Sequence, residues 1–184
     1  MGIREDNRSV SESPILKSAR PGPLSALQVA VGSVLFTGFI PIAPATFGTL
    51  AALALVWALP KSVIIYGAAL AVLFSLGVWL ATVLERRWGA DARQITIDEL
   101  VGTLVSFFLV PFGLIPAIAG FVLFRFFDII KLPFVRWFER LPGGWGIVMD
   151  DVMAGVCTNV VLQVLFRLAF HLNGLKQWSM LNWS

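Results

Sequence analysis

Acidic side chains stand inside runs of sequence that are otherwise apolar. Asp150 and Asp151 are adjacent in GIVMDDVMAG, Asp98 and Glu99 are adjacent in TIDELVG, and Asp128 lies in FRFFDIIK. Buried carboxylates persist when they are paired or bound to a metal, and ionisable residues within membrane segments are functional candidates. The sequence therefore predicts one site built from carboxylates that lie far apart along the chain.

The ligand types point to a hard cation. Cys157 and His171 are the only cysteine and histidine, so neither a thiolate cluster nor an imidazole pair can form. Mg²⁺ is typically held by one or two carboxylates, with substrate phosphate and water completing its octahedron. The acids therefore favour Mg²⁺.

Basic residues flank one of these acids. Arg125, Asp128 and Lys131 are spaced i, i+3 and i+6, so they share one face of a helix. One interpretation is a structural row of salt bridges on an interfacial helix that Pro133 ends. The other is an acid for a cation beside two bases for a phosphoryl group. The nearby pair of aspartates favours the second interpretation, which is phosphoryl chemistry at a membrane surface.

Two local interpretations compete with a metal site. Thr96 and Glu99 have the spacing of a capping box, which would satisfy amides at a helix start. Acids in the first turn of a helix are stabilised by the macrodipole, which explains one of Asp150 and Asp151 better than two. Gly102 follows Asp98 by about one turn and is a position where a second backbone can approach closely.

The composition predicts a protein embedded in lipid. Of 184 residues, 58% are hydrophobic and 14% charged, and the mean hydropathy is +0.83. Soluble domains are about half apolar and about a quarter charged. The net charge of +3 favours anionic lipid headgroups over nucleic acid. The apolar runs expected to form helices are 24–59, 62–84, 100–124 and 147–169.

The expected fold class is all-α, a multi-pass helical membrane protein forming a single compact bundle with Pro/Gly-broken helices. Residues 1–23 are interpreted as a disordered cytoplasmic tail, 24–175 as the membrane domain and 176–184 as a C-terminal tail. Lys and Arg gather in the tail, after Leu84 and in 125–140, so these parts are placed in the cytoplasm. Run 24–59 then crosses once as a broken element, 62–84 returns, and 100–124 folds back at Pro111, Gly113 and Pro116.

Three blocks, in this order, resemble the phosphatidylglycerophosphatase A family. They are PIAPATFGTLAA (41–52), IDELVG (97–102) and FRFFDIIKLPFVRWFERLPGGWGIVMDDVMAG (124–155). The resemblance covers about 24–163; it departs from the family pattern at Ala45, Leu132 and Glu139 but keeps the acids and bases. It implies a Mg²⁺-dependent lipid phosphatase of the bacterial inner membrane. Such an enzyme converts phosphatidylglycerophosphate to phosphatidylglycerol and inorganic phosphate, the last step of phosphatidylglycerol synthesis.

On this resemblance we hypothesise a mechanism. The predicted Mg²⁺ ligands are Asp98, Glu99, Asp150 and Asp151, and Asp128 is a further ligand or the group that orients the attacking water. Arg125 and Lys131 bind the terminal phosphate, and Thr46 lends a hydroxyl and a helix N-terminus to the anion or simply caps the helix. The residues predicted to act in catalysis are Arg125, Asp128, Lys131 and Asp151. Trp137 and Trp145 are expected at headgroup level.

Other interpretations stay open at this point. Attack by a carboxylate ranks below attack by water, because the chain has no Asp-x-Asp pair. An ion-coupled transporter would place its acids near mid-membrane in broken helices, whereas here they lie at the ends of apolar runs beside bases. A structural membrane subunit would tolerate loss of Asp150 or Asp151. The partners expected are the lipid substrate and the bilayer, without nucleic acid or an obligate protein partner.

Overall fold

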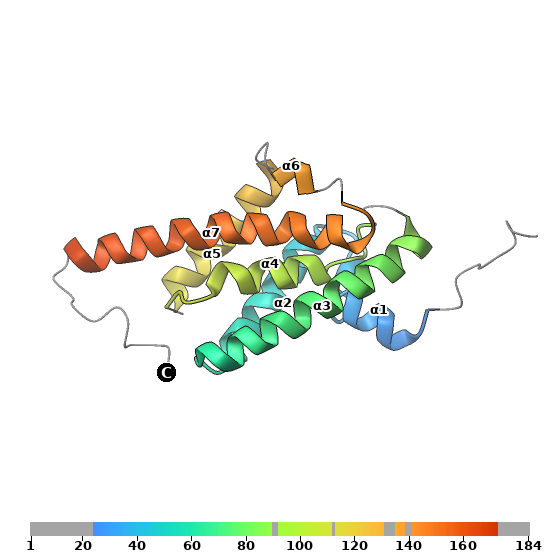
Figure 1. The fold of residues 1–184 in the computed structure, drawn as a ribbon, viewed down its shortest axis with the longest axis horizontal. Helices are drawn as coiled ribbons and strands as arrows, with labels where there is room; N and C mark the ends of the chain where they lie inside the picture. The colour runs from blue at the N-terminus through green and yellow to red at the C-terminus, as the bar shows by residue number, and fades with distance from the viewer. Residues whose placement is uncertain (1–23, 90–91, 112, 131–134, 139–140, 173–184) are drawn as a thin grey trace, which may run out of the picture.

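All regular elements in the described part of the chain are helices, as predicted (Figure 1). The computed structural model describes residues 24–89, 92–111, 113–130, 135–138 and 141–172. Its elements are α1 (Ala26–Gly32), the 3-10 helix η2 (Thr37–Phe39), α2 (Pro44–Ala58), α3 (Val63–Trp88), α4 (Ile97–Phe107), α5 (Leu114–Ile130), α6 (Val135–Phe138) and α7 (Gly144–Leu172). The two predicted tails, 1–23 and 176–184, lie outside the described residues. The predicted membrane domain, 24–175, is described from residue 24 to Leu172, apart from the gaps given above.

The predicted breaks in two apolar runs are confirmed. Run 24–59 is interrupted between α1 and α2, where Val34, Leu35 and Phe36 all have positive φ. Pro44 then occupies the first turn of α2, where its missing N–H costs nothing. Run 100–124 is interrupted between α4 and α5. The start of α4 and the last turns of α5 line one cavity, so this run folds back on itself as expected.

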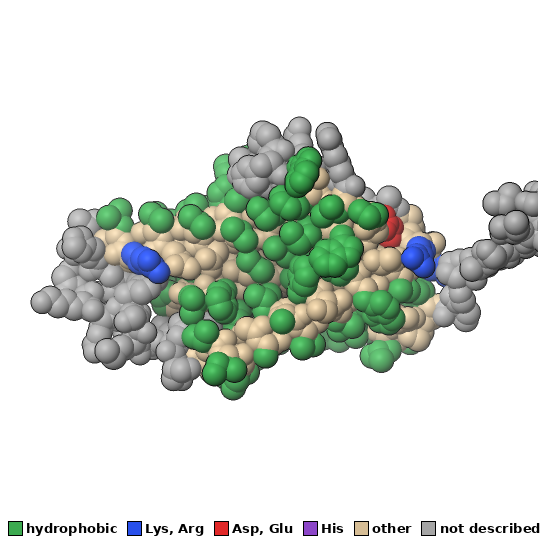
Figure 2. Space-filling model, in the orientation of Figure 1, with side chains coloured by type: hydrophobic (Ala, Val, Ile, Leu, Met, Phe, Trp, Pro, Cys, Tyr) green, Lys and Arg blue, Asp and Glu red, His purple; other side chains and the backbone are tan. Residues whose placement is uncertain are grey.

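Two helices are long and apolar enough, by length and composition, to cross a membrane. In α3 and α7 the qualifying stretches, Val63–Trp88 and Gly144–Ala169, each have 26 residues. At 1.5 Å per residue, 26 residues extend about 39 Å, which exceeds the roughly 30 Å of a bilayer's hydrocarbon core. The surface supports membrane association, because hydrophobic side chains cover the face shown in Figure 2 and charged ones gather toward its ends. Ile64 on α3 and Ile115 on α5, for example, are 82% and 74% exposed.

Helix α4 forms the centre of the bundle. It lies between α3 and α7 in Figure 1 and also packs against α2 and α5. Nearly all of its side chains are buried, and they include Leu100, Val101, Leu104 and Phe107. The outer helices present apolar surface instead. The described residues therefore form an apolar core that encloses a few polar groups, and the outer helices add exposed apolar side chains, which fits membrane association.

The backbones of α4 and α7 approach each other at two glycines. A Cβ on Gly102 would lie 2.5 Å from the carbonyl oxygen of Asp151, and a Cβ on Gly155 would overlap the carbonyl oxygen of Gly102. The close backbone approach predicted at Gly102 is thus confirmed. The contact places the middle of α4 directly beside Asp151, one turn after Asp98 and Glu99.

Side chains of neighbouring helices satisfy backbone carbonyls of α4. The amide nitrogen of Asn159 on α7 donates to the carbonyl oxygens of Phe108 at 2.7 Å and of Ser106 at 3.1 Å. Tyr66 on α3 donates its hydroxyl to the carbonyl oxygen of Leu104 at 2.9 Å. The last carbonyls of a helix have no partner within the helix, so these donors fix the end of α4 away from the acids.

We predict that Gly102→Ala and Gly155→Ala each destabilise the protein by about 1–3 kcal/mol, because a methyl group would force the two backbones apart. Gly67→Ala is the matched control. Gly67 lies in α3 with no atom within 4 Å of its Cβ position, and alanine there improves helix propensity by up to about 1 kcal/mol. Thermal unfolding in detergent measures all three. A Gly102→Ala protein as stable as Gly67→Ala would contradict the close contact.

Candidate active site

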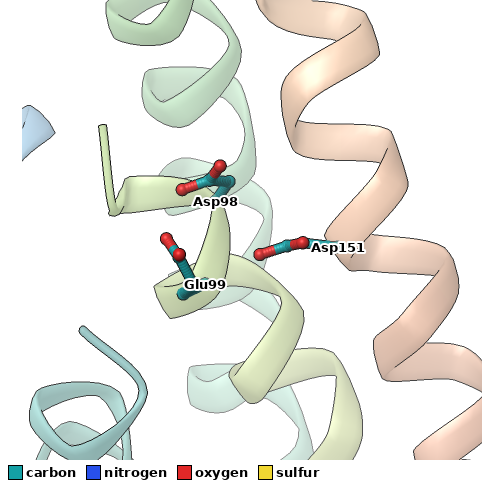
Figure 3. A group of neighbouring side chains, drawn as sticks. All are labelled: Asp98, Glu99 and Asp151. Carbon is teal, nitrogen blue, oxygen red and sulfur yellow. The ribbon is translucent and has the colours of Figure 1, made fainter. Parts of the chain in front are cut away.

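The predicted convergence of distant acids is confirmed. Oxygens from the carboxylates of Asp98, Glu99 and Asp151 all lie within 4.8 Å of one another, and so do oxygens from Asp128, Asp150 and Asp151. Figure 3 shows Asp98 and Glu99 on α4, with the Asp151 carboxylate pointing across from α7. Three helices, α4, α5 and α7, therefore supply one cluster of acids, and Asp151 belongs to both groups.

Several oxygens of this cluster are buried without a partner. Glu99 is 8% exposed and Asp151 is 5% exposed. Asp98 Oδ1, Glu99 Oε2 and Asp151 Oδ2 accept no hydrogen bond from the residues that the structure describes. An ionised carboxylate in such surroundings carries a desolvation cost of several kcal/mol, which a bound cation offsets. The donor set therefore fits a hard divalent cation such as Mg²⁺.

The burial changes the acidity of the two carboxyl groups on α4, which lie outside both candidate spans. Burial raises the pKa of Asp98 to about 6, and the negative charge of Asp128 adds to this. Burial also raises the pKa of Glu99 well above its ordinary value, and the charges of Asp98 and Asp151 raise it further. These acids repel one another unless a proton or a cation lies among them.

The capping-box interpretation is wrong. Thr96 does stand at the N-cap of α4, but its side chain makes no capping hydrogen bond. Its hydroxyl lies 3.2 Å from the hydroxyl of Thr37, and its backbone N–H donates to the carbonyl oxygen of Gly32 at 3.1 Å. Tertiary contacts with the segment between α1 and α2 thus replace the local cap. Glu99 is therefore free of that role and belongs to the acid cluster.

The macrodipole interpretation of Asp150 and Asp151 is also wrong. Helix α7 begins at Gly144, earlier than the apolar run suggested, and its first turn holds no acidic residue. Both aspartates therefore lie beyond the turn in which the helix dipole stabilises negative charge. The helix dipole therefore does not account for either carboxylate, and both belong to a group of neighbouring acids.

The basic partner predicted for this site is present on α5. Arg125 Nη1 lies 2.7 Å from Asp128 Oδ2, so the salt bridge at i, i+3 forms. Arg125 also lines a cavity of about 300 Å³ together with Asp98 and Glu99. The guanidinium therefore faces the same space as the acids. Lys131 lies outside the described residues, so its predicted role stays a prediction.

The cavity brings in a residue that the motifs did not single out. Its described lining residues are Ala43, Pro44, Ala45, Ala92, Arg93, Ile95, Asp98, Glu99, Arg125 and Ile147. Thr46 follows two of them on α2 but is not among them, so its contact with phosphate stays a prediction. From the sequence, Arg93 is interpreted only as one of the basic residues after Leu84 that are placed in the cytoplasm. Its position five residues before Asp98 was the signal available in the sequence.

A sequence model of the phosphatidylglycerophosphatase A family matches residues 30–166. The chain belongs to this family. All members of the acid cluster and Arg125 fall within the matched region. No solved structure matches the chain significantly.

Individual relatives match most of the chain. The chain is 33% identical over 172 residues to phosphatidylglycerophosphatase A of Escherichia coli strain K12, covering 88% of this chain and 92% of the relative. It is 35% identical over 156 residues to phosphatidylglycerophosphatase A of Haemophilus influenzae, covering 82% and 93%. A Bacteroides thetaiotaomicron protein with the provisional name phosphatidylinositol-3-phosphatase is 41% identical over 149 residues, which cover 76% of this chain and 94% of the relative.

We predict that the cation-free protein becomes less stable as pH rises from 5 to 7.5. The unfolded Asp98 loses its proton near pH 3.8, whereas the folded one keeps it to about pH 6. The folded state thus binds more protons in this window, and stability falls as pH rises through it. Thermal unfolding in EDTA should show a lower midpoint at pH 7.5, and each 1 kcal/mol corresponds to about 2–4 °C.

Added Mg²⁺ at pH 7.5 should restore the midpoint, because the cation replaces the missing protons as counter-charge. A midpoint in EDTA that is the same at both pH values, and that Mg²⁺ leaves unchanged, would contradict the description of the cluster.

Proposed function

We propose that this protein is a Mg²⁺-dependent membrane phosphatase that converts phosphatidylglycerophosphate to phosphatidylglycerol and inorganic phosphate. The observation that carries the proposal is the convergence of buried, unpartnered carboxylate oxygens beside Arg125 in one cavity. Family membership supports the same activity. The reaction would be the last step of phosphatidylglycerol synthesis.

The acid cluster would hold the cation. Asp98, Glu99 and Asp151 form one candidate set of ligands, and Asp128, Asp150 and Asp151 form a second. Mg²⁺ bound there supplies a Lewis acid that withdraws charge from the phosphoryl oxygens. Because both groups share Asp151, this residue is expected to matter most.

The chain's own groups would position the phosphoryl group and the water. Arg125 faces the cavity and offers a planar guanidinium to the terminal phosphate. The ion pair with Asp128 would fix that guanidinium, and the Asp128 carboxylate would orient the attacking water. The water oxygen adds to phosphorus, the terminal P–O ester bond breaks, and a proton ends on the leaving glycerol oxygen.

The distribution of surface residues supports a site at the lipid boundary. The cavity holds the charged groups, while the outer faces of α3, α5 and α7 are apolar. Trp137 and Trp145 are 66% and 49% exposed, as interfacial anchors would be. We place the protein in the bacterial inner membrane as a multi-pass protein with its site toward the cytoplasm.

A second substrate is favoured by one relative. The Bacteroides protein carries a name that refers to phosphatidylinositol 3-phosphate, and this lipid also presents a phosphate monoester on a headgroup joined by a phosphodiester.

Phosphate release by the purified protein from both lipids and from phosphatidic acid, with Mg²⁺ or with excess EDTA, tests the proposal. Hydrolysis of phosphatidylglycerophosphate that EDTA abolishes is the expected result. Faster hydrolysis of phosphatidylinositol 3-phosphate would make that lipid the substrate instead. Full activity in EDTA would contradict the assignment of a metal site.

We predict that Asp151→Asn lowers phosphate release at least about a hundredfold, the usual cost of removing a group that stabilises the transition state. The variant should unfold in EDTA at a temperature no lower than the wild type, because it relieves repulsion among the acids. Glu85→Gln is the matched control, since Glu85 stands at the end of α3 outside both acid groups. Full activity in Asp151→Asn would leave only a structural role for the cluster. Loss of both activity and folding would indicate a structural requirement.

A further inference from the structure

We propose that Arg93 binds the second phosphate of the substrate, the phosphodiester that joins the headgroup to diacylglycerol. Arg93 would thereby select lipids with a phosphorylated headgroup over phosphatidic acid, whose only phosphate is the monoester. This inference rests on the proposed function and identifies a residue that determines specificity at the same site.

Arg93 lies between two cavities. The first, of about 300 Å³, also contains Asp98, Glu99 and Arg125. The second, of about 170 Å³, is lined by Gly38, Phe39, Ile40, Pro41, Pro44, Arg93 and Gln94. Arg93 and Pro44 line both. A ligand that places one phosphate among the acids and extends toward the second cavity therefore passes Arg93.

The polarity along this path matches that of a phospholipid. At one end are buried carboxylates and the Arg125–Asp128 ion pair, which suit a cation and a phosphate monoester. At the other end Phe39 lines the second cavity and is 49% exposed, and the neighbouring Phe36 is also exposed. The lining of this cavity is of mixed polarity, and its Phe39 and Ile40 side chains suit the part of the lipid next to the acyl chains. The phosphodiester lies between these parts in the lipid, as Arg93 does in the protein.

The cavity has two arginines, Arg125 and Arg93, which would each bind one of the two phosphates of the lipid. Arg125 is paired with Asp128 at 2.7 Å and so stays close to the acid cluster. Arg93 comes from the segment before α4, is exposed and lines the same cavity. A guanidinium forms charge-assisted, bidentate hydrogen bonds with phosphate oxygens. One arginine for each phosphate follows from this arrangement.

The backbone that carries Arg93 is held in place. Thr96 donates its N–H to the carbonyl oxygen of Gly32 at 3.1 Å, and Ile95 donates to the carbonyl oxygen of Ala92 at 2.9 Å. Gly38 packs so tightly on the backbone of Gln94 that a Cβ there would overlap the Gln94 carbonyl. A fixed backbone lowers the entropic cost of using a long side chain for recognition.

The test compares wild type, Arg93→Ala and Arg93→Lys, with Arg86→Ala as the control. Arg86 is an exposed arginine in the last turn of α3 and lines neither cavity. We expect Arg93→Ala to lower the ratio of kcat/KM for phosphatidylglycerophosphate over phosphatidic acid at least about tenfold, the equivalent of one charge-assisted hydrogen bond. The change should lie mainly in KM. Arg93→Lys should recover part of the ratio, and Arg86→Ala should keep the wild-type ratio.

A binding measurement makes the inference independent of turnover. In the Asp151→Asn background, Arg93→Ala should weaken binding to phosphatidylglycerophosphate in mixed micelles at least about tenfold relative to phosphatidic acid. An unchanged ratio, or an equal loss for both lipids, would overturn the role of Arg93. A wild type that binds in this Arg93-dependent way without hydrolysing the lipid would refute the proposed function and leave the role of Arg93 standing.

Discussion

The close crossing of α4 and α7 at Gly102 and Gly155 is the constraint on which the site depends. With no side chain at either position, the two backbones meet, and the carbonyl of Asp151 lies beside Gly102. The same contact brings the Asp151 carboxylate within reach of those of Asp98 and Glu99. Larger residues would separate the helices and with them the carboxylates. Helix packing, which in most bundles serves stability, here also sets the distance between charged groups.

The acid cluster lowers the stability of the fold but forms the site where the proposed chemistry takes place. Several carboxylates share a space from which solvent is largely excluded, and some of their oxygens have no hydrogen-bond donor among the described residues. Burial of like charges opposes folding, while apolar packing around α4 favours it. Residues such as Val101, Leu104 and Phe107 are almost fully buried in that packing. A cation bound there, as proposed, would offset the repulsion among the acids and would couple binding to folding.

Much of the fold and part of the site followed from the sequence. The apolar runs and their proline and glycine breaks predicted the helices, because these signals act locally along the chain. The adjacent acids and Gly102 predicted the cluster, because carboxylates in apolar surroundings need a counter-charge wherever they meet. The cap at Thr96 was predicted wrongly, and the structure also excludes the macrodipole interpretation of Asp150 and Asp151, which the sequence analysis ranks below a metal site. In the first case a contact with Thr37 from a distant segment decided the geometry. In the second the helix began at Gly144, before the apolar run.

Arg93 was missed for a related reason. Its recruitment depends on how the segment before α4 rests against Gly32 and Gly38, and no spacing pattern along the chain records that contact. Motifs report residues that cooperate within one element. Residues that cooperate across elements become visible only when the elements are assembled.

The amide of Asn159 has a consequence beyond the carbonyls that it satisfies. Helix α7 holds α4 at two points, through Asn159 at the end of α4 and through the backbone contact between Asp151 and Gly102 in its middle. A helix held at two separated points cannot slide along its neighbour by a turn without breaking both. The axial register of the two helices is therefore fixed. The exposed side chains of α7, such as Val160 and Val164, take no part in that fixation, so changes there would leave the alignment of the acids unchanged.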